Sequence, residues 1–222
     1  MIQKTSLSFL KNLKKNNHRE WFEKNRAAYQ SAKEDMSDLV QEVIATFGKK
    51  DPGIAMLTAK DCLFRINRDV RFSKNKDPYK TNIGASIVSG GKKSPMAGYY
   101  IHIEPGKCFI GGGRYMAEAD EIKKIRQEID YNWDTFKKII SNKKFRDCYG
   151  ELERGEGISL SREPRGYEKD NPAIEYLKLK SWIATSPLSD EDVTSKDLVK
   201  KITAAFETLQ PLIYFLNEAL EA

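Results

Sequence analysis

The chain has 222 residues, of which 40% are hydrophobic, and it carries a net charge of +6 at pH 7. This content is ample for a packed core, and no apolar run approaches the roughly 18 residues that a membrane helix needs. The composition therefore excludes a membrane-spanning protein and predicts a globular protein of the cytoplasm, with no membrane partner.

Cysteine and histidine content argues against a metal centre. The three cysteines, Cys62, Cys108 and Cys148, lie far apart, which fits a reducing compartment. Neither His18 nor His102 has another histidine or a cysteine within a helical turn, so a zinc site is not expected. We expect no metal and no cofactor, although these counts leave a carboxylate site for Mg²⁺ or Ca²⁺ open.

Helices are predicted at the N-terminus. Apolar residues recur every three or four positions in residues 6–15 and again, with one break, in residues 19–47. Asn16-Asn17 ends the first pattern, and Gly48 is a suitable stop for the second.

The middle of the chain has the two-residue period of strands. Residues 62–72 alternate between apolar and polar side chains, and residues 83–88 do the same. Residues 99–104 and 107–110 flank Pro105-Gly106, which predicts a hairpin.

Helical spacing returns in residues 122–140 and near Phe145, while residues 158–162 and 181–185 are short strand candidates. From Ser195 onward we expect a helical hairpin whose second half starts or kinks at Pro211. Helices at both ends of strand-rich chain predict an α+β fold, in which N-terminal and C-terminal helices pack around a mostly antiparallel central sheet. We expect a single domain, residues 1–222.

Positive charge is concentrated between Lys60 and Lys80, where seven basic residues face three acids. In a strand, Arg65, Asp69 and Arg71 would share one face. If Tyr100, His102 and Glu104 lay on the same side of the sheet, the two sets would form a cleft for an anion, because guanidinium groups bind phosphate and carboxylate in a bidentate manner. Alternatively, the arginines and Asp69 form a solvated salt-bridge ladder.

Two further features accompany this face. Arg68 falls on the apolar side of the predicted strand and needs a buried partner, a route to water or a bulge. The polar loop that follows offers further ligand-binding candidates, namely Ser73, Lys74, Lys76, Tyr79 and Lys80.

A glycine-rich run, residues 111–113, precedes a predicted helix. Gly112, Gly113 and Arg114 could present amides and a cation to an anion. The glycines could equally permit a bulge, and the acids Glu118 and Glu121 can satisfy the same amides.

His102 is the candidate general base, with Glu104 beside it on the same face and Asp69 as a further catalytic candidate. A lone histidine on a strand can also be purely structural, so the sequence leaves the question of enzymatic activity open.

Several motifs together resemble a known family. They are REWFEKNRAAY, FRINRDVRFSKNKDPYKT, GYYIHIEPGKCFIGGGRY, IRQEID and PRGYEKDNPAIEYLKLKSW, in this order along nearly the whole chain. They resemble the domain-of-unknown-function 2461 family of bacterial and fungal proteins. The resemblance implies a signature that includes residues 68–80, with Asn75 where the family commonly has aspartate, but it implies no activity, substrate or cofactor.

Two functions compete. The first is a cleft that binds or processes a small phosphate- or carboxylate-bearing ligand through Arg65, Arg68, Arg71 and Lys80. The alternative is a nucleic-acid-binding module, in which the loop lysines contact phosphates and Phe72 or Tyr79 stacks on bases. A structural or interaction protein is a third interpretation, and the oligomeric state stays open.

Overall fold

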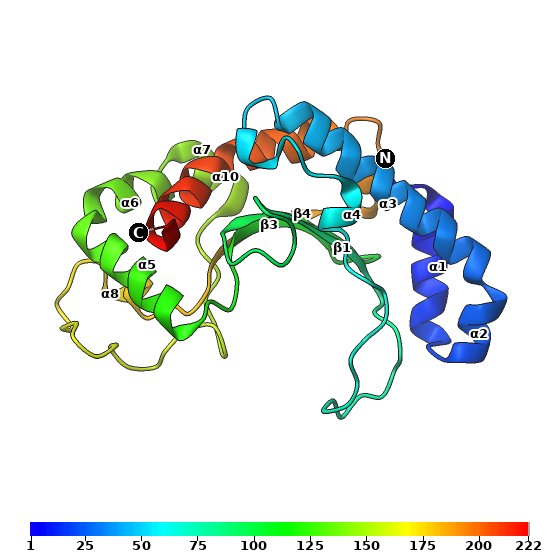
Figure 1. Ribbon diagram of the computed structural model, residues 1–222, viewed down its shortest axis with the longest axis horizontal. Helices are drawn as coiled ribbons and strands as arrows, with labels where there is room; N and C mark the ends of the chain where they lie inside the picture. Colours follow the sequence, from blue (N-terminus) through cyan, green and yellow to red (C-terminus); the bar gives the residue numbers. More distant parts are fainter. Residues whose placement is uncertain (222) are drawn as a thin grey trace. The chain divides into compact units, whose positions relative to one another are not determined.

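A computed structural model describes residues 1–221 (Figure 1). The fold is α+β, as predicted, with ten helices and a four-stranded antiparallel sheet in the described chain. The strands are β1 (Ile83–Ile87), β2 (Gly98–Ile103), β3 (Cys108–Arg114) and β4 (Trp182–Leu188), in the order β1-β2-β3-β4.

The chain forms two compact units. Unit 1 comprises residues 1–92, 100–110 and 187–204, and unit 2 comprises residues 93–99, 111–186 and the chain from Ala205 through the end of the last helix. The strands β2, β3 and β4 each supply residues to both units. That the two units act as a single domain stays a prediction.

Unit 1 begins with three helices, α1 (Lys4–Lys15), α2 (Arg19–Lys24) and α3 (Arg26–Phe47). The expected break lies at Asn25, whose side-chain amide donates to the Trp21 carbonyl over 2.9 Å and ends α2. Helix α1 packs against α3 through an apolar stripe that includes Leu10 and Leu13. The buried apolar side chains of α1 and α3 form a large part of the hydrophobic core of unit 1.

The predicted strand at residues 62–72 is wrong. A 3-10 turn, η1 (Pro52–Ile54), leads to the short helix α4 (Ala59–Cys62), which a reciprocal Thr58–Asp61 capping box starts. Beyond it the chain makes only isolated bridges, Leu63 to Ala85 and Asn67 to Tyr79.

Residues 67–79, hereafter the arm, fold back on themselves and project from the rest of unit 1 (Figure 1). The Arg68 amide donates to the Pro78 carbonyl over 2.9 Å, and the Lys80 amide donates to Ile66 over 2.8 Å. The alternating pattern thus belongs to a narrow two-stranded ribbon, in which the first half of the segment pairs with the second half. A period of two indicates an extended chain but does not specify which segment it pairs with.

The predicted hairpin is confirmed in β2 and β3, with the turn at Pro105-Gly106. Burial alternates along β2: Tyr99, Ile101 and Ile103 are buried, whereas Tyr100 and His102 are partly exposed. One side of β2 therefore faces the core and the other side carries polar groups.

Unit 2 contains α5 (Ala119–Tyr131), α6 (Trp133–Ile140), α7 (Lys143–Tyr149) and α8 (Ile174–Leu177). The helix α5 packs against α6 and α8. The strand predicted at residues 158–162 is wrong: only the single bridge from Ser159 to Leu179 forms there, whereas the predicted strand near Ser181 is present as β4.

At the C-terminus the predicted helical hairpin is also wrong. The short helix α9 (Asp190–Thr194) precedes one continuous helix, α10 (Leu198–Glu221), which contains Pro211. A proline inside a helix costs about 3 kcal/mol. Buried residues on both sides of it, such as Phe206, Leu209 and Leu212, continue one apolar stripe and offset this cost.

Among the described residues, no helix combines the length and the apolar character that a bilayer crossing requires.

Candidate functional site

A row of three polar side chains lies on the open side of β2 and just beyond its end, entirely within unit 1. The Tyr100 hydroxyl lies 3.2 Å from His102 Nδ1, and His102 Nε2 lies 3.5 Å from Glu104 Oε2. These residues, hereafter the β2 row, come together as the two-residue spacing predicted.

Neighbouring elements hold both ends of the β2 row. The Phe109 ring of β3 stacks on the His102 imidazole, with centroids 4.6 Å apart and planes 15° apart. Thr81 donates its hydroxyl to Glu104 over 3.1 Å, and Lys14 of α1 forms an ion pair with the same carboxylate at 3.6 Å. The side chains of His102 and Glu104 are only 14% and 15% exposed, so their geometry is well fixed.

Burial sets the protonation of the β2 row. It lowers the pKa of His102, a shift that the neighbouring Glu104 carboxylate opposes. Burial also raises the pKa of Tyr100. At neutral pH we therefore assign a neutral imidazole, with Nδ1 accepting from the Tyr100 hydroxyl and the Nε2 proton facing Glu104.

A glycine makes room for the Tyr100 hydroxyl. A Cβ at Gly84 of β1 would overlap the hydroxyl oxygen and would lie 3.0 Å from Tyr100 Cζ. Real Cβ atoms do not approach so closely, so position 84 has to be glycine for Tyr100 to lie across β1.

A small recess adjoins this end of the β2 row, and Gly84 and Phe64 form part of its wall. Phe64 also contacts the Tyr100 ring, with centroids 6.4 Å apart. The cations in the wall are Lys33, Arg65 and Lys80, and no carboxylate belongs to the lining. We call this feature the recess.

The charge of Lys80 is destabilised in the recess. Burial and the nearby Arg65 charge lower the pKa of Lys80. Its ammonium lies 5.2 Å from the centroid of the Phe64 ring, a weak cation–π contact. Within residues 1–221, neither Lys80 nor Arg65 forms an ion pair with a carboxylate.

The other predicted anion binders of this region do not join the recess. Arg68 turns back into the arm and donates to the Asp77 carbonyl over 3.0 Å and to the Ser73 hydroxyl over 3.2 Å. Lys76 donates to the Val70 carbonyl over 3.1 Å. The buried or bulged environment expected for Arg68 is replaced by a local one, because the arm is a ribbon and has no core-facing side.

Asp69 and Arg71 also stay apart from the β2 row. They form an ion pair at 2.7 Å with side chains 48% and 76% exposed, and hydrogen bonds from Arg71 lower the pKa of Asp69. Asp69 and Arg71 therefore form the exposed salt bridge of the alternative interpretation and do not line the recess with Arg65. Lys74 is exposed on the arm.

Tyr79 is a core residue. Its ring is 6% exposed and stacks on Phe22 with centroids 4.0 Å apart. Asn17 clamps its backbone by accepting from the Tyr79 amide over 3.1 Å and donating to its carbonyl over 2.9 Å. The predicted contact of Tyr79 with a ligand or a base is incompatible with this burial.

The glycine run lies in unit 2 as the end of β3, rather than in a loop before the helix. Cβ atoms at Gly112 and Gly113 would overlap the carbonyl oxygens of Gly98 and Trp182, and Gly113 has a φ of 125°. The close approach of neighbouring backbone therefore accounts for these glycines, which lie in a strand and not in an anion-binding loop.

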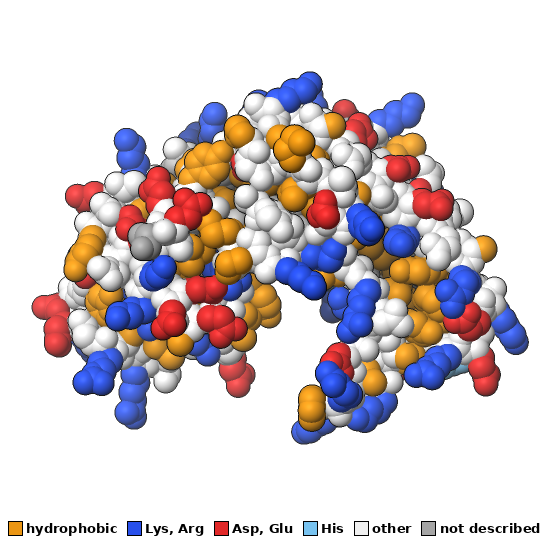
Figure 2. All heavy atoms as spheres, in the orientation of Figure 1, with side chains coloured by type: hydrophobic (Ala, Val, Ile, Leu, Met, Phe, Trp, Pro, Cys, Tyr) orange, Lys and Arg blue, Asp and Glu red, His pale blue; other side chains and the backbone are white. Residues whose placement is uncertain are grey.

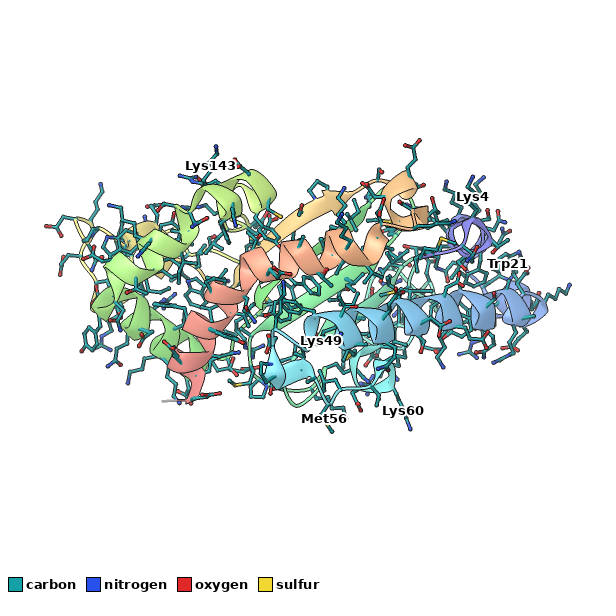
Figure 3. All side chains as sticks on the ribbon, turned by 90° about the horizontal axis from the view of Figure 1, so that it is seen from above. Lys4, Trp21, Lys49, Met56, Lys60 and Lys143 are labelled. Atoms are coloured by element: carbon teal, nitrogen blue, oxygen red, sulfur yellow. The ribbon has the colours of Figure 1, made fainter. Side chains whose placement is uncertain are left out.

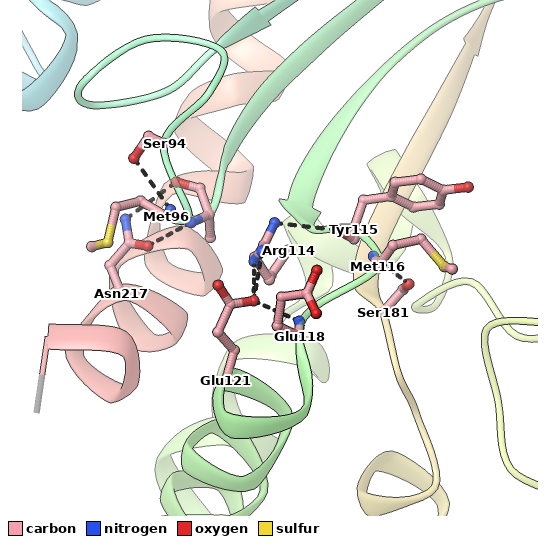
Figure 4. Close-up of polar contacts among 10 residues, drawn as sticks. Ser94, Met96, Arg114, Tyr115, Met116, Glu118, Glu121, Ser181 and Asn217 are labelled. Carbon is pink, nitrogen blue, oxygen red and sulfur yellow. Dashed lines mark hydrogen bonds and ion pairs between the residues drawn. The ribbon is translucent and has the colours of Figure 1, made fainter. Parts of the chain in front are cut away.

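Arg114, also in unit 2, forms an ion pair with Glu121. Its Nε donates to Glu121 Oε2 over 3.0 Å, and Glu118 and Glu121 form the capping box of α5 (Figure 4). As expected, acidic side chains accept hydrogen bonds from the first amides of this helix. Arg114 is paired with one of these acids, Glu121.

Sequence reasoning missed four residues that define the site: Lys14, Thr81, Gly84 and Phe109. Phe109 lies on the second strand of the predicted hairpin, whereas Lys14, Thr81 and Gly84 are far from the β2 row in sequence, and of these three only Gly84, a glycine amid a strand pattern, carried a recognisable local signal. Within residues 1–221, no group of three or more His, Cys, Asp and Glu side chains is arranged to hold a metal ion.

Comparison with known proteins places this geometry in a family. The family described as "Conserved hypothetical protein (DUF2461)" matches residues 5–215. The chain belongs to this family. The match confirms the resemblance and, in this DUF2461 member, includes the whole of the β2 row, the recess and the arm. The chain matches none of the curated proteins and none of the solved structures with which it was compared.

Proposed function

We propose that unit 1 binds the anionic group of a small phosphate- or carboxylate-bearing ligand at the mouth of the recess, because the cavity itself, about 10 Å³, has room only for a water-sized group. One observation carries the proposal. The positive charges of Arg65 and Lys80 lie near each other in a recess whose lining includes no carboxylate. Like charges in this arrangement repel each other, and an anion between them would replace the repulsion with two charge-assisted hydrogen bonds.

The ligand would meet the β2 row at Tyr100. Gly84 and Phe64 belong to the recess wall, and both lie next to the Tyr100 side chain. A proton leaving the ligand could pass to the Tyr100 oxygen while the Tyr100 proton moves to His102 Nδ1. The Glu104 carboxylate beside Nε2 would stabilise the imidazolium that forms. The proposed site thus pairs anion binding with a proton acceptor.

This proposal narrows the predicted set of anion binders to Arg65 and Lys80. We also propose that the protein works in the cytoplasm, as the cysteine content suggests.

Proton NMR of the histidine rings tests the binding proposal directly, because the chain has only two histidines. His102 lies in the β2 row, whereas His18 caps α2 and accepts from the Trp21 amide over 3.4 Å. We expect titration with inorganic phosphate or phenyl phosphate at constant pH to shift the His102 resonances and to leave those of His18 in place.

Three variants give the test its specificity. R65A and K80A should each abolish the His102 shift, while R71A, which removes an exposed guanidinium outside the recess, should retain it. Equal shifts at both histidines, or a His102 shift that survives R65A and K80A, would exclude binding in the recess.

A further inference from the structure

Phe72, at the end of the arm, is the most exposed large hydrophobic residue of the described chain, with 96% of its surface accessible. A ring in this position contributes nothing to the core. Burying it against a partner would be favourable, because the ring is large and apolar. Such a ring is informative because it is available for a partner.

The arm holds Phe72 in place through its own contacts. The Arg68 guanidinium donates hydrogen bonds to both Asp77 and Ser73, and the Lys76 ammonium donates to the Val70 carbonyl. Asn75 and Asp77 exchange two hydrogen bonds, of 3.0 Å from the Asn75 amide and 2.8 Å from the Asp77 backbone. At the base, the buried Tyr79 anchors the arm to α2. The tip is therefore internally braced, which lowers the entropy cost of presenting Phe72 to a partner.

The surroundings of Phe72 are cationic. The Arg71 guanidinium lies 5.8 Å from the centroid of the ring. Residues 67–79 contain four cations, Arg68, Arg71, Lys74 and Lys76, against the two acids Asp69 and Asp77. Figure 2 shows Lys and Arg side chains along the arm, with hydrophobic atoms at its end. Both acids already have partners in Arg71 and Asn75.

We propose that the arm binds single-stranded nucleic acid, with Phe72 stacking on an unpaired base and Arg71 and Lys74 contacting the adjacent phosphates. An isolated ring among cations matches a base flanked by phosphates. A protein partner would instead favour further apolar side chains next to the ring, because the core of a protein–protein interface is apolar and depleted of charged residues. The sequence offered Phe72 and Tyr79 as alternatives for stacking, and burial of Tyr79 leaves Phe72. The proposal does not rest on ligand binding in the recess.

Fluorescence anisotropy with a labelled 12-nucleotide single strand at low salt tests the proposal. We expect F72A to weaken binding by about tenfold or more, the size of one lost stacking contact. The matched control is M56A, since Met56 is 93% exposed and lies outside the arm, just after η1 (labelled in Figure 3). It should leave affinity unchanged.

A second pair of variants, K74A and K49A, tests the proposed contacts with phosphates. K74A should reduce the dependence of log affinity on log salt by about 0.7, the loss of one phosphate contact on a single strand. K49A removes an exposed lysine after α3, labelled in Figure 3, and should leave the slope unchanged.

Three outcomes would overturn the proposal. They are the absence of binding at low salt, unchanged affinity in F72A, and equal affinity for a duplex of the same sequence. Self-association of the wild-type chain that F72A abolishes, without nucleic-acid binding, would assign the ring to a second copy instead.

Discussion

Tyr100, His102 and Glu104 stand two residues apart and form one largely buried row, whereas Asp69 and Arg71, with the same spacing, form only an exposed ion pair on the arm. The first set lies on a strand whose neighbours, β1 and β3, supply Gly84 and Phe109. The second set spans the start of a ribbon that pairs with itself. Even spacing aligns side chains, but only flanking strands turn them into a buried network.

The arm itself contains the sharpest contrast, between two aromatic residues of one signature. Y79A should destabilise the protein by about 3–5 kcal/mol, as expected for a large buried ring. F72A should leave the free energy of unfolding nearly unchanged, since its ring is exposed. Urea denaturation measures both values. Similar losses in the two variants would mean that the arm tip packs against the rest of unit 1.

The fit between β1 and the β2 row gives the next largest expected effect. G84A should cost about 1–3 kcal/mol, because the new methyl group displaces the Tyr100 ring. In the double variant G84A/Y100F the nearest atom, the hydroxyl oxygen of Tyr100, is absent. This variant should therefore recover part of the stability that G84A loses.

S86A serves as the control for this cycle, because Ser86 lies on the same strand and is only partly buried. It should change stability by less than about 0.5 kcal/mol. Strictly additive losses in G84A and Y100F would show that Gly84 does not make room for Tyr100.

The smallest expected effect is a pH dependence. Burial places the folded-state pKa of His102 below its unfolded value of about 6.5, so the unfolded chain binds the proton more readily. The contribution of His102 to stability is therefore intact above about pH 7 and falls as the pH drops through about 6.5 toward the folded-state pKa.

Urea midpoints between pH 5 and pH 8 measure this contribution. H102Q should flatten the profile in this range. Identical profiles for the wild type and H102Q would contradict the assignment of a neutral, buried imidazole.

Much of the secondary structure followed from periodicity. The helices α1 to α3, the hairpin of β2 and β3, and the composition of the β2 row were all predictable, because local spacing determines them. The capping acids Glu118 and Glu121 were likewise readable at the start of α5.

The failures share a physical origin. The predicted strand at residues 62–72 and the predicted break at Pro211 depended on partners that spacing does not specify. Residues 66–80 pair with their own return, and α10 stays continuous because buried residues flank Pro211 on both sides.

The sequence by itself determined an α+β protein with a polar row on one strand and a dense basic segment before it. Only the tertiary structure decided that the basic segment splits, with Arg65 and Lys80 at a recess and Arg68 and Arg71 on the arm. The reason is that charge and alternation are local properties of a chain, whereas the partner of each arginine depends on which segments fold against it.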